Sequence, residues 1–239
     1  ECLERMLERT HSKSRFVACW KNFLFSEDTP EEVREDYLSK PDLKSVFSNH
    51  DFIDASIFCK EVLVRWQENF VGEPTSVLVH RECFNKYGNF NPDFATFADM
   101  ECWMRIGIHE GLTIVPEVLA TFRVHNLSMS GAIRHAHLYR AELEKVLMFS
   151  NLAFADQYAP LRAYATNMNP PIDPISKLIH SAQVVKWQAV HAKHSQNDLT
   201  LSIEWERFCR QYPHINNLLL NKKETSTSLF KRIKNILRI

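Results

Sequence analysis

The chain has 239 residues, enough for one large hydrophobic core or two small ones, and its 45% apolar and 24% charged content is ordinary for a folded globular protein. Twenty-nine basic residues balance 29 acidic ones, so composition gives no reason to expect a nucleic-acid partner. The six cysteines are widely spaced without a Cys-x-x-Cys pair, which predicts reduced, buried thiols and a cytoplasmic location rather than a zinc or disulfide framework. No apolar run approaches the ~18 residues of a membrane span.

The first part of the chain predicts an α/β layer. Residues 1–13 read as an amphipathic helix, and because the chain starts at Glu1 without Met, we expect it to begin inside a domain. Residues 15–25, RFVACWKNFLF, are rich in aromatic and β-branched residues and predict a buried strand. Residues 27–42 hold seven acidic and two basic residues, which indicates a solvated insertion that contains a helix.

The middle of the chain alternates short helices and strands. An apolar helix is expected at 53–66, and Gly72-Glu73-Pro74 then breaks the chain before a strand at 75–79. A short helix at 81–87 should end at Gly88, whose freedom to adopt positive φ suits a helix cap.

A loop at 89–96 leads into a helix at 97–109, and Leu112 to Val124 supplies strand material interrupted by Pro116. Beyond Gly131 the apolar residues repeat with helical spacing, and three prolines between 167 and 174 mark a turn between helices. The tail after Asn221 has six basic residues and one acidic one, and residues 227–239 could form a basic amphipathic helix on an anionic membrane surface or a terminal helix packed on its own domain.

Asp99 and Arg105 are the first candidates for chemistry. Asp99 falls in the first turn of its helix, where backbone N–H groups favour an ionised carboxylate, so it is either a helix cap or a base. Arg105 could bind a phosphate or form an exposed ion pair with Glu101.

Histidines give weaker signals. His125 ends a strand before a Ser-rich loop and is either structural or a metal or phosphate contact. A metal hydrolase that uses Asp99, His109 and His125 ranks low, because the chain has no closely spaced ligand pair such as His-x-x-x-His.

Three ordered motifs add up to a resemblance. The blocks GEPTSVLVHRECFNKYGNFNP, ADMECWMRI and VPEVLATFRVHNLSMSG cover about 60 residues. Together they resemble the second half of a bacterial family 2 glycosyltransferase with the GT-A fold. The resemblance implies a partial GT-A domain with a Rossmann-like mixed sheet at residues 1–131, followed by a helical extension at 132–239.

The resemblance also implies an activity, namely inverting transfer of a sugar from a nucleotide-diphosphate donor to a hydroxyl of a glycan or a lipid-linked acceptor. Asp99 would be the general base, and Mg²⁺ or Mn²⁺ would neutralise the leaving diphosphate. The residues that would contact the donor or its diphosphate are Arg105, Arg123, His125, Ser128 and Ser130, with His125 also supporting the metal. Glu73 and Trp103 would line the acceptor side, although Trp103 also lies on the core stripe of its helix.

The chain departs from the family pattern in two ways. Ala98 replaces the first carboxylate of the acidic pair, and the nucleotide-binding half with its Asp-x-Asp motif is absent. We therefore expect a fragment of an enzyme of bacterial surface-polysaccharide synthesis, cytoplasmic or peripheral on the inner face of the plasma membrane. The alternative is a non-catalytic module that kept the fold and docks on a membrane or partner.

Overall fold

The computed structural model describes residues 1–10, 15–125, 140–195 and 199–221. Its centre is a mixed sheet in the order β2-β4-β1-β3, built from β1 (Phe16–Phe25), β2 (Phe52–Ile53), β3 (Val77–Val79) and β4 (Leu112–Val124). β4 runs parallel to β1, whereas β2 and β3 are antiparallel to their neighbours. This sheet confirms the predicted α/β class and both long strands.

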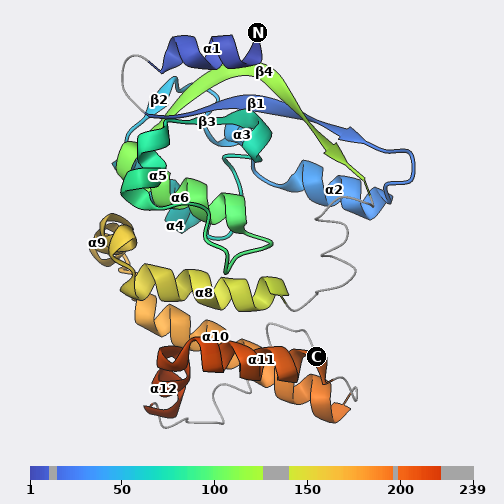
Figure 1. Ribbon diagram of the computed structural model, residues 1–239, viewed down its shortest axis with the longest axis vertical. Coiled ribbons are helices and arrows are strands. Elements are labelled where there is room, and N and C mark those ends of the chain that lie inside the picture. Colours follow the sequence, from blue (N-terminus) through green and yellow to red (C-terminus); the bar gives the residue numbers. More distant parts are fainter. Residues whose placement is uncertain (11–14, 126–139, 196–198, 222–239) are drawn as a thin grey trace.

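β1 and β4 continue as a two-stranded ribbon beyond the rest of the sheet (Figure 1). The register pairs Cys19 with Val115 but Trp20 with Val118, so Pro116 and Glu117 lie in a bulge. A bulge accommodates proline because its missing N–H then costs no ladder bond. After the bulge the strands pair as far as Phe25 and Val124, while β2 and β3 pair only near the strand starts.

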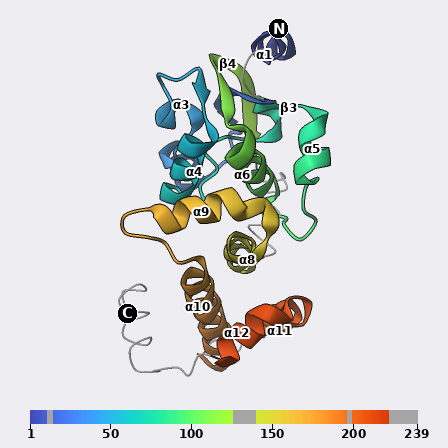
Figure 2. The ribbon, with the colours of Figure 1, turned by 90° about the vertical axis from the view of Figure 1, so that its left-hand side faces the viewer.

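Helices cover both faces of the sheet (Figures 1 and 2). The alternation of β1 sends Val17 and Cys19 toward Met6 of α1 (Cys2–Arg9), and Phe16 and Ala18 into the main core. That core contains the buried faces of α4 (Ala55–Val64) and α6 (Ala98–Glu110). The predicted helices at 53–66 and 97–109 are thus confirmed with slightly shifted ends.

Short elements complete this layer. The acidic insertion contains α2 (Glu31–Ser39) and is followed by α3 (Leu43–Val46). The predicted strand at 75–79 begins instead as a 3-10 turn, η1 (Pro74–Ser76), because Pro74 cannot donate to a strand ladder. α5 (Arg81–Tyr87) ends at Gly88 with φ +92°, as predicted.

A second tier of helices lies beneath the sheet layer (Figures 1 and 2). It consists of α8 (Arg140–Phe154), η2 (Asp156–Tyr158), α9 (Ala159–Asn167), α10 (Pro174–Ser195), α11 (Thr200–Gln211) and α12 (Pro213–Asn221). The predicted turn at 167–174 separates α9 from α10. One continuous hydrophobic cluster includes Phe58 of α4, Ile106 of α6, Leu147 of α8 and Leu178 of α10. The two tiers therefore share a core.

All six cysteines are free, and four of them, Cys19, Cys59, Cys83 and Cys102, are buried, as predicted. In the described ranges no helix combines the length and the apolar character that crossing a bilayer requires. The basic tail at 227–239 and the predicted domain boundary at 131 lie outside the described residues.

Candidate functional site

A cleft of about 630 Å³ opens between segments of the sheet layer and the start of α8. One side is the β1–β4 ribbon with α2, and the other is the turn around Asn69 to Pro74 with the loop that leads into α6. Asp99 and Glu73, two of the predicted site residues, both line it. A second hollow of about 500 Å³, between α4, α6 and α9, has no charged residue in its lining. Of these two hollows, only the first combines space for a ligand with charged side chains.

Asp99 is half-buried in the first turn of α6, but it is not the helix cap. The capping position is Phe97, and the Asp99 carboxylate accepts a hydrogen bond of 2.7 Å from the N–H of Met100. Burial raises the pKa of Asp99 from 3.8 to about 6; the Met100 N–H and Lys21 oppose this rise, and the negative charge of Glu73 adds to it. A carboxylate with this pKa is ionised at neutral pH yet basic enough to accept a proton.

The raised pKa predicts that Asp99 lowers stability at neutral pH. The penalty is absent below the unfolded pKa near 4 and complete above the folded pKa of about 6. Asp99→Asn should therefore stabilise the chain by on the order of 1–3 kcal/mol at about pH 8, with the gain vanishing toward about pH 4. Urea unfolding at several pH values measures this difference. Glu68→Gln removes an exposed carboxylate from the same cleft and serves as the control.

The tight turn from Asn69 to Gly72 positions Asn69, the side chain that contacts Asp99. The side-chain amide of Asn69 donates to the Asp99 carboxylate at 3.4 Å, and its oxygen accepts from the Gly72 N–H at 3.0 Å. Gly72 has φ +116°, and a Cβ there would lie 2.7 Å from the Ser76 Oγ, so the turn requires glycine. The indole of Trp103 donates to the Gly72 carbonyl at 2.9 Å. Trp103, predicted on the acceptor side, is buried and supports this turn from the core.

Glu73 forms an ion pair with Lys21 of β1. Both side chains line the cleft, and they are only 18% and 8% exposed, respectively. Sequence reasoning missed Lys21 and Asn69. The available signal for Lys21 was a lysine at the centre of a mostly apolar strand, where a charge needs a partner.

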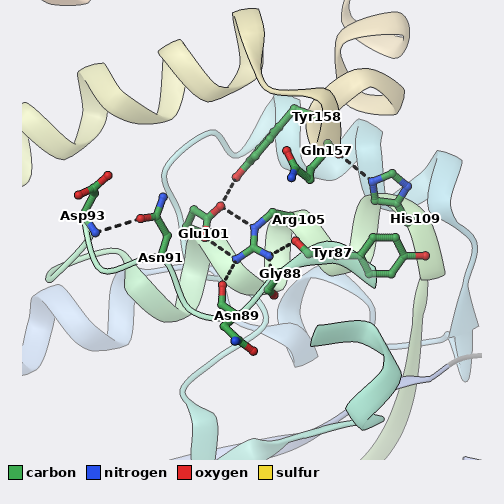
Figure 3. Close-up of polar contacts among 10 residues, drawn as sticks. All are labelled: Tyr87, Gly88, Asn89, Asn91, Asp93, Glu101, Arg105, His109, Gln157 and Tyr158. Atoms are coloured by element: carbon green, nitrogen blue, oxygen red, sulfur yellow. Dashed lines mark hydrogen bonds and ion pairs between the residues drawn. The ribbon is translucent and has the colours of Figure 1, made fainter. Parts of the chain in front are cut away.

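Arg105 lies in the interior, in a network that Figure 3 shows. Its guanidinium contacts both carboxylate oxygens of Glu101, at 2.8 and 3.0 Å. It also donates to the carbonyls of Tyr87, Gly88 and Asn89. The expected ion pair exists, but it is buried rather than exposed, because the Tyr158 hydroxyl of the second tier covers Glu101 and donates to it at 2.9 Å. Arg105 is not among the cleft-lining residues, and its contact with a diphosphate stays a prediction from the resemblance.

Glu144 of α8 fixes the loop at the edge of the cleft. Its buried carboxylate accepts hydrogen bonds of 2.8, 2.9 and 2.9 Å from the N–H groups of Ala95, Thr96 and Phe97. These three residues line the cleft and are separated from Asp99 only by Ala98. The carboxylate thus satisfies N–H groups that would otherwise be unpaired at the start of α6.

Among the residues that the structure describes, the remaining predicted ones do not line the cleft. Arg123 is exposed and neighbours Phe122, which lines the cleft, so strand alternation directs Arg123 to the other face. His125 follows β4 and is half-buried, and it is not among the cleft-lining residues described. Ser128 and Ser130 lie outside the described residues. His109 donates a hydrogen bond from Nε2 to the Gln157 carbonyl and stacks on Tyr87, in the network region of Figure 3.

The described residues do not fit a resident divalent cation. No three of their histidine, cysteine, aspartate or glutamate side chains are grouped as ligands. In the cleft, the Glu73 carboxylate is already paired with Lys21. The described part of the chain therefore supplies no donor set for the predicted Mg²⁺ or Mn²⁺.

Comparisons with known proteins add one short similarity. No family model and no solved structure matches the chain. A stretch of 68 residues is 31% identical to the uncharacterized protein MT1568 of Mycobacterium tuberculosis. The stretch is 28% of this chain and 21% of that protein, and the relative is itself without a described activity. Function therefore has to be argued from the cleft.

Proposed function

We propose that this chain is the acceptor-side part of an inverting glycosyltransferase with a GT-A fold, of the family 2 type. The observation that carries the proposal is Asp99, a half-buried carboxylate with a pKa of about 6 that borders a cleft of about 630 Å³. Its place at the start of α6 is the position that the resemblance gives to the general base. The mixed sheet and the helix packed on it are compatible with the second half of such a domain.

The proposed reaction is a single displacement at the anomeric carbon of the donor sugar. An acceptor hydroxyl gives its proton to the Asp99 carboxylate as its oxygen bonds to the anomeric carbon. The bond to the diphosphate breaks at the same time, and the diphosphate leaves with the electron pair. Asn69 donates to Asp99 and holds the carboxylate in place, while the Lys21–Glu73 pair keeps the adjacent wall charged and polar.

The resemblance assigns the nucleotide-diphosphate sugar and its Mg²⁺ or Mn²⁺ to a nucleotide-binding half in a longer protein. Among the described residues of this chain no cation site is present. The contacts of His125, Ser128 and Ser130 with the diphosphate stay predictions from the resemblance, as do the glycan or lipid-linked acceptor and the location at the inner face of the plasma membrane.

The acid limb of the pH profile tests the proposal. If ionised Asp99 is the base, kcat/KM for sugar transfer by an enzyme that contains this chain should fall about tenfold per pH unit below about pH 6. Glu73→Gln removes a negative charge that raises the Asp99 pKa and leaves Lys21, which lowers it, without its carboxylate. Both changes favour the ionised form, so the acid limb should move to lower pH.

Initial rates between about pH 5 and about pH 8 measure this limb. Glu68→Gln removes a carboxylate from the same cleft and serves as the matched control, with its limb unchanged. A Glu73→Gln limb that stays in place or moves to higher pH would contradict the assignment of Asp99 as the titrating base.

A further inference from the structure

Three aromatic rings form one wall of the cleft. Phe23 of β1 and Phe122 of β4 are paired across the ribbon, with ring centroids 6.3 Å apart. Tyr37 of α2 packs against both, at 5.5 Å from Phe23 and 6.1 Å from Phe122. All three are half-buried and all three line the cleft. We call this set the aromatic wall.

Each end of the aromatic wall carries a lysine that is neutralised by a carboxylate. The Lys21 Nζ lies 5.2 Å from the centroid of Phe23 and pairs with Glu73. The Lys40 Nζ lies 5.5 Å from the centroid of Tyr37 and pairs with Asp36 at 2.6 Å. Neither lysine therefore brings an uncompensated positive charge to the cleft.

The described lining of the cleft is acidic. Beyond the two ion pairs, its lining contains three further carboxylates, Asp42, Glu68 and Asp99, and no further lysine or arginine among the described residues. A ligand group with a negative charge would be repelled here, since like charges in a partly closed cleft interact through a low effective dielectric. An uncharged ligand rich in hydroxyls can instead donate hydrogen bonds to the carboxylates.

We propose that the aromatic wall seats an uncharged pyranose ring of the acceptor, and that the cleft rejects uronic acids and phosphorylated sugars. This inference rests on the proposed function and specifies its acceptor. The apolar C–H face of a pyranose packs on aromatic rings as other apolar surface does, while its edge hydroxyls reach polar side chains. A cleft of about 630 Å³ falls within the size range of small-molecule sites. A ring on the wall lies in the same cleft as Asp99, the proposed base.

Saturation-transfer difference NMR on the 239-residue chain tests the proposal. The neutral probes are the methyl β-glycosides of glucose, galactose, mannose and N-acetylglucosamine. The methyl glycosides of glucuronic and galacturonic acid differ from two of these only by the carboxylate. Uridine is the third arm, since an aromatic wall could also stack a nucleobase. Tyr37→Ala, at an exposed helix of the cleft edge, should weaken binding of the neutral glycoside about two- to tenfold.

The controls distinguish an effect of the aromatic wall from an effect on the fold and from an effect on the proposed base. Tyr37→Phe keeps the ring and should bind as the wild type does, and Phe154→Ala removes an exposed ring outside the cleft without effect. This experiment measures binding, whereas the pH profile above measures turnover, so a failure of the base assignment and a failure of the acceptor assignment are distinguishable. Absence of binding by every neutral glycoside, uronides that bind equally well, binding unchanged by Tyr37→Ala, or Tyr37-dependent binding of uridine alone would each overturn the proposal.

Discussion

Asp99→Asn in an enzyme that contains this chain should reduce the rate of sugar transfer by about 10²- to 10⁴-fold, the usual contribution of a general base. Asparagine has the shape of aspartate and can still contact Asn69 and Met100, so the geometry of the first turn of α6 is kept. What it loses is the basic oxygen. The loss should therefore appear in kcat, with binding of the nucleotide sugar unchanged, because no donor contact is assigned to Asp99.

A matched variant shows whether the effect belongs to this one carboxylate. Asp36→Asn removes a carboxylate from the same cleft, where it pairs with Lys40 at the exposed edge, and should change turnover by less than about threefold, the size of a surface ion-pair effect. Turnover by Asp99→Asn close to that of the wild type would remove the sugar-transfer mechanism and favour the non-catalytic alternative.

Arg105→Met should destabilise the folded chain by about 3–5 kcal/mol, the cost of leaving a buried charge without its partner. The change leaves the Glu101 carboxylate buried with the Tyr158 hydroxyl as its remaining side-chain donor shown in Figure 3. It also removes the donors to the carbonyls of Tyr87, Gly88 and Asn89, which turn the chain between α5 and the cleft loop. Urea unfolding of the 239-residue chain measures the loss.

Arg207→Met is the surface counterpart, since Arg207 pairs with Glu204 on α11 with most of its side chain in solvent. It should cost less than about 1 kcal/mol. In the double variant Arg105→Met with Glu101→Gln, the loss should be smaller than the sum of the two single losses, because the buried carboxylate is neutralised together with its partner. Equal, small effects of Arg105→Met and Arg207→Met would contradict the structural role and favour the predicted ligand contact of Arg105.

Local sequence patterns predicted the elements well where neighbouring residues decide them. The aromatic run of β1, the helix that carries Asp99 and the glycine end of α5 each depend on residues within a few positions of one another. The same holds for the Glu101–Arg105 pair, whose spacing of four residues places both side chains on one helix face. Its burial was not predictable in this way, because the covering residue Tyr158 is 57 positions away from Glu101.

The cleft could be predicted only in part for the same reason. Asp99 and Glu73 stand in recognisable motifs, whereas Lys21 reaches Glu73 across 52 residues. The aromatic wall needs the register that pairs Phe23 with Phe122 and the packing of α2 on both. No local period encodes those pairings. The sequence motif also favoured Arg123 for the site, but strand alternation beside Phe122 turns its side chain to the opposite face.

Glu144 holds the loop before Asp99 by accepting hydrogen bonds from backbone N–H groups. An anchor of that kind does not depend on which side chains the three anchored residues carry, provided none of them is proline. Mutations at 95–97 can therefore change what the mouth of the cleft presents to a ligand without releasing the loop. The ligand selectivity of this edge of the cleft can therefore change by evolutionary drift or by selection from a library. The residue that has to be kept is Glu144, which belongs to α8 in the second tier.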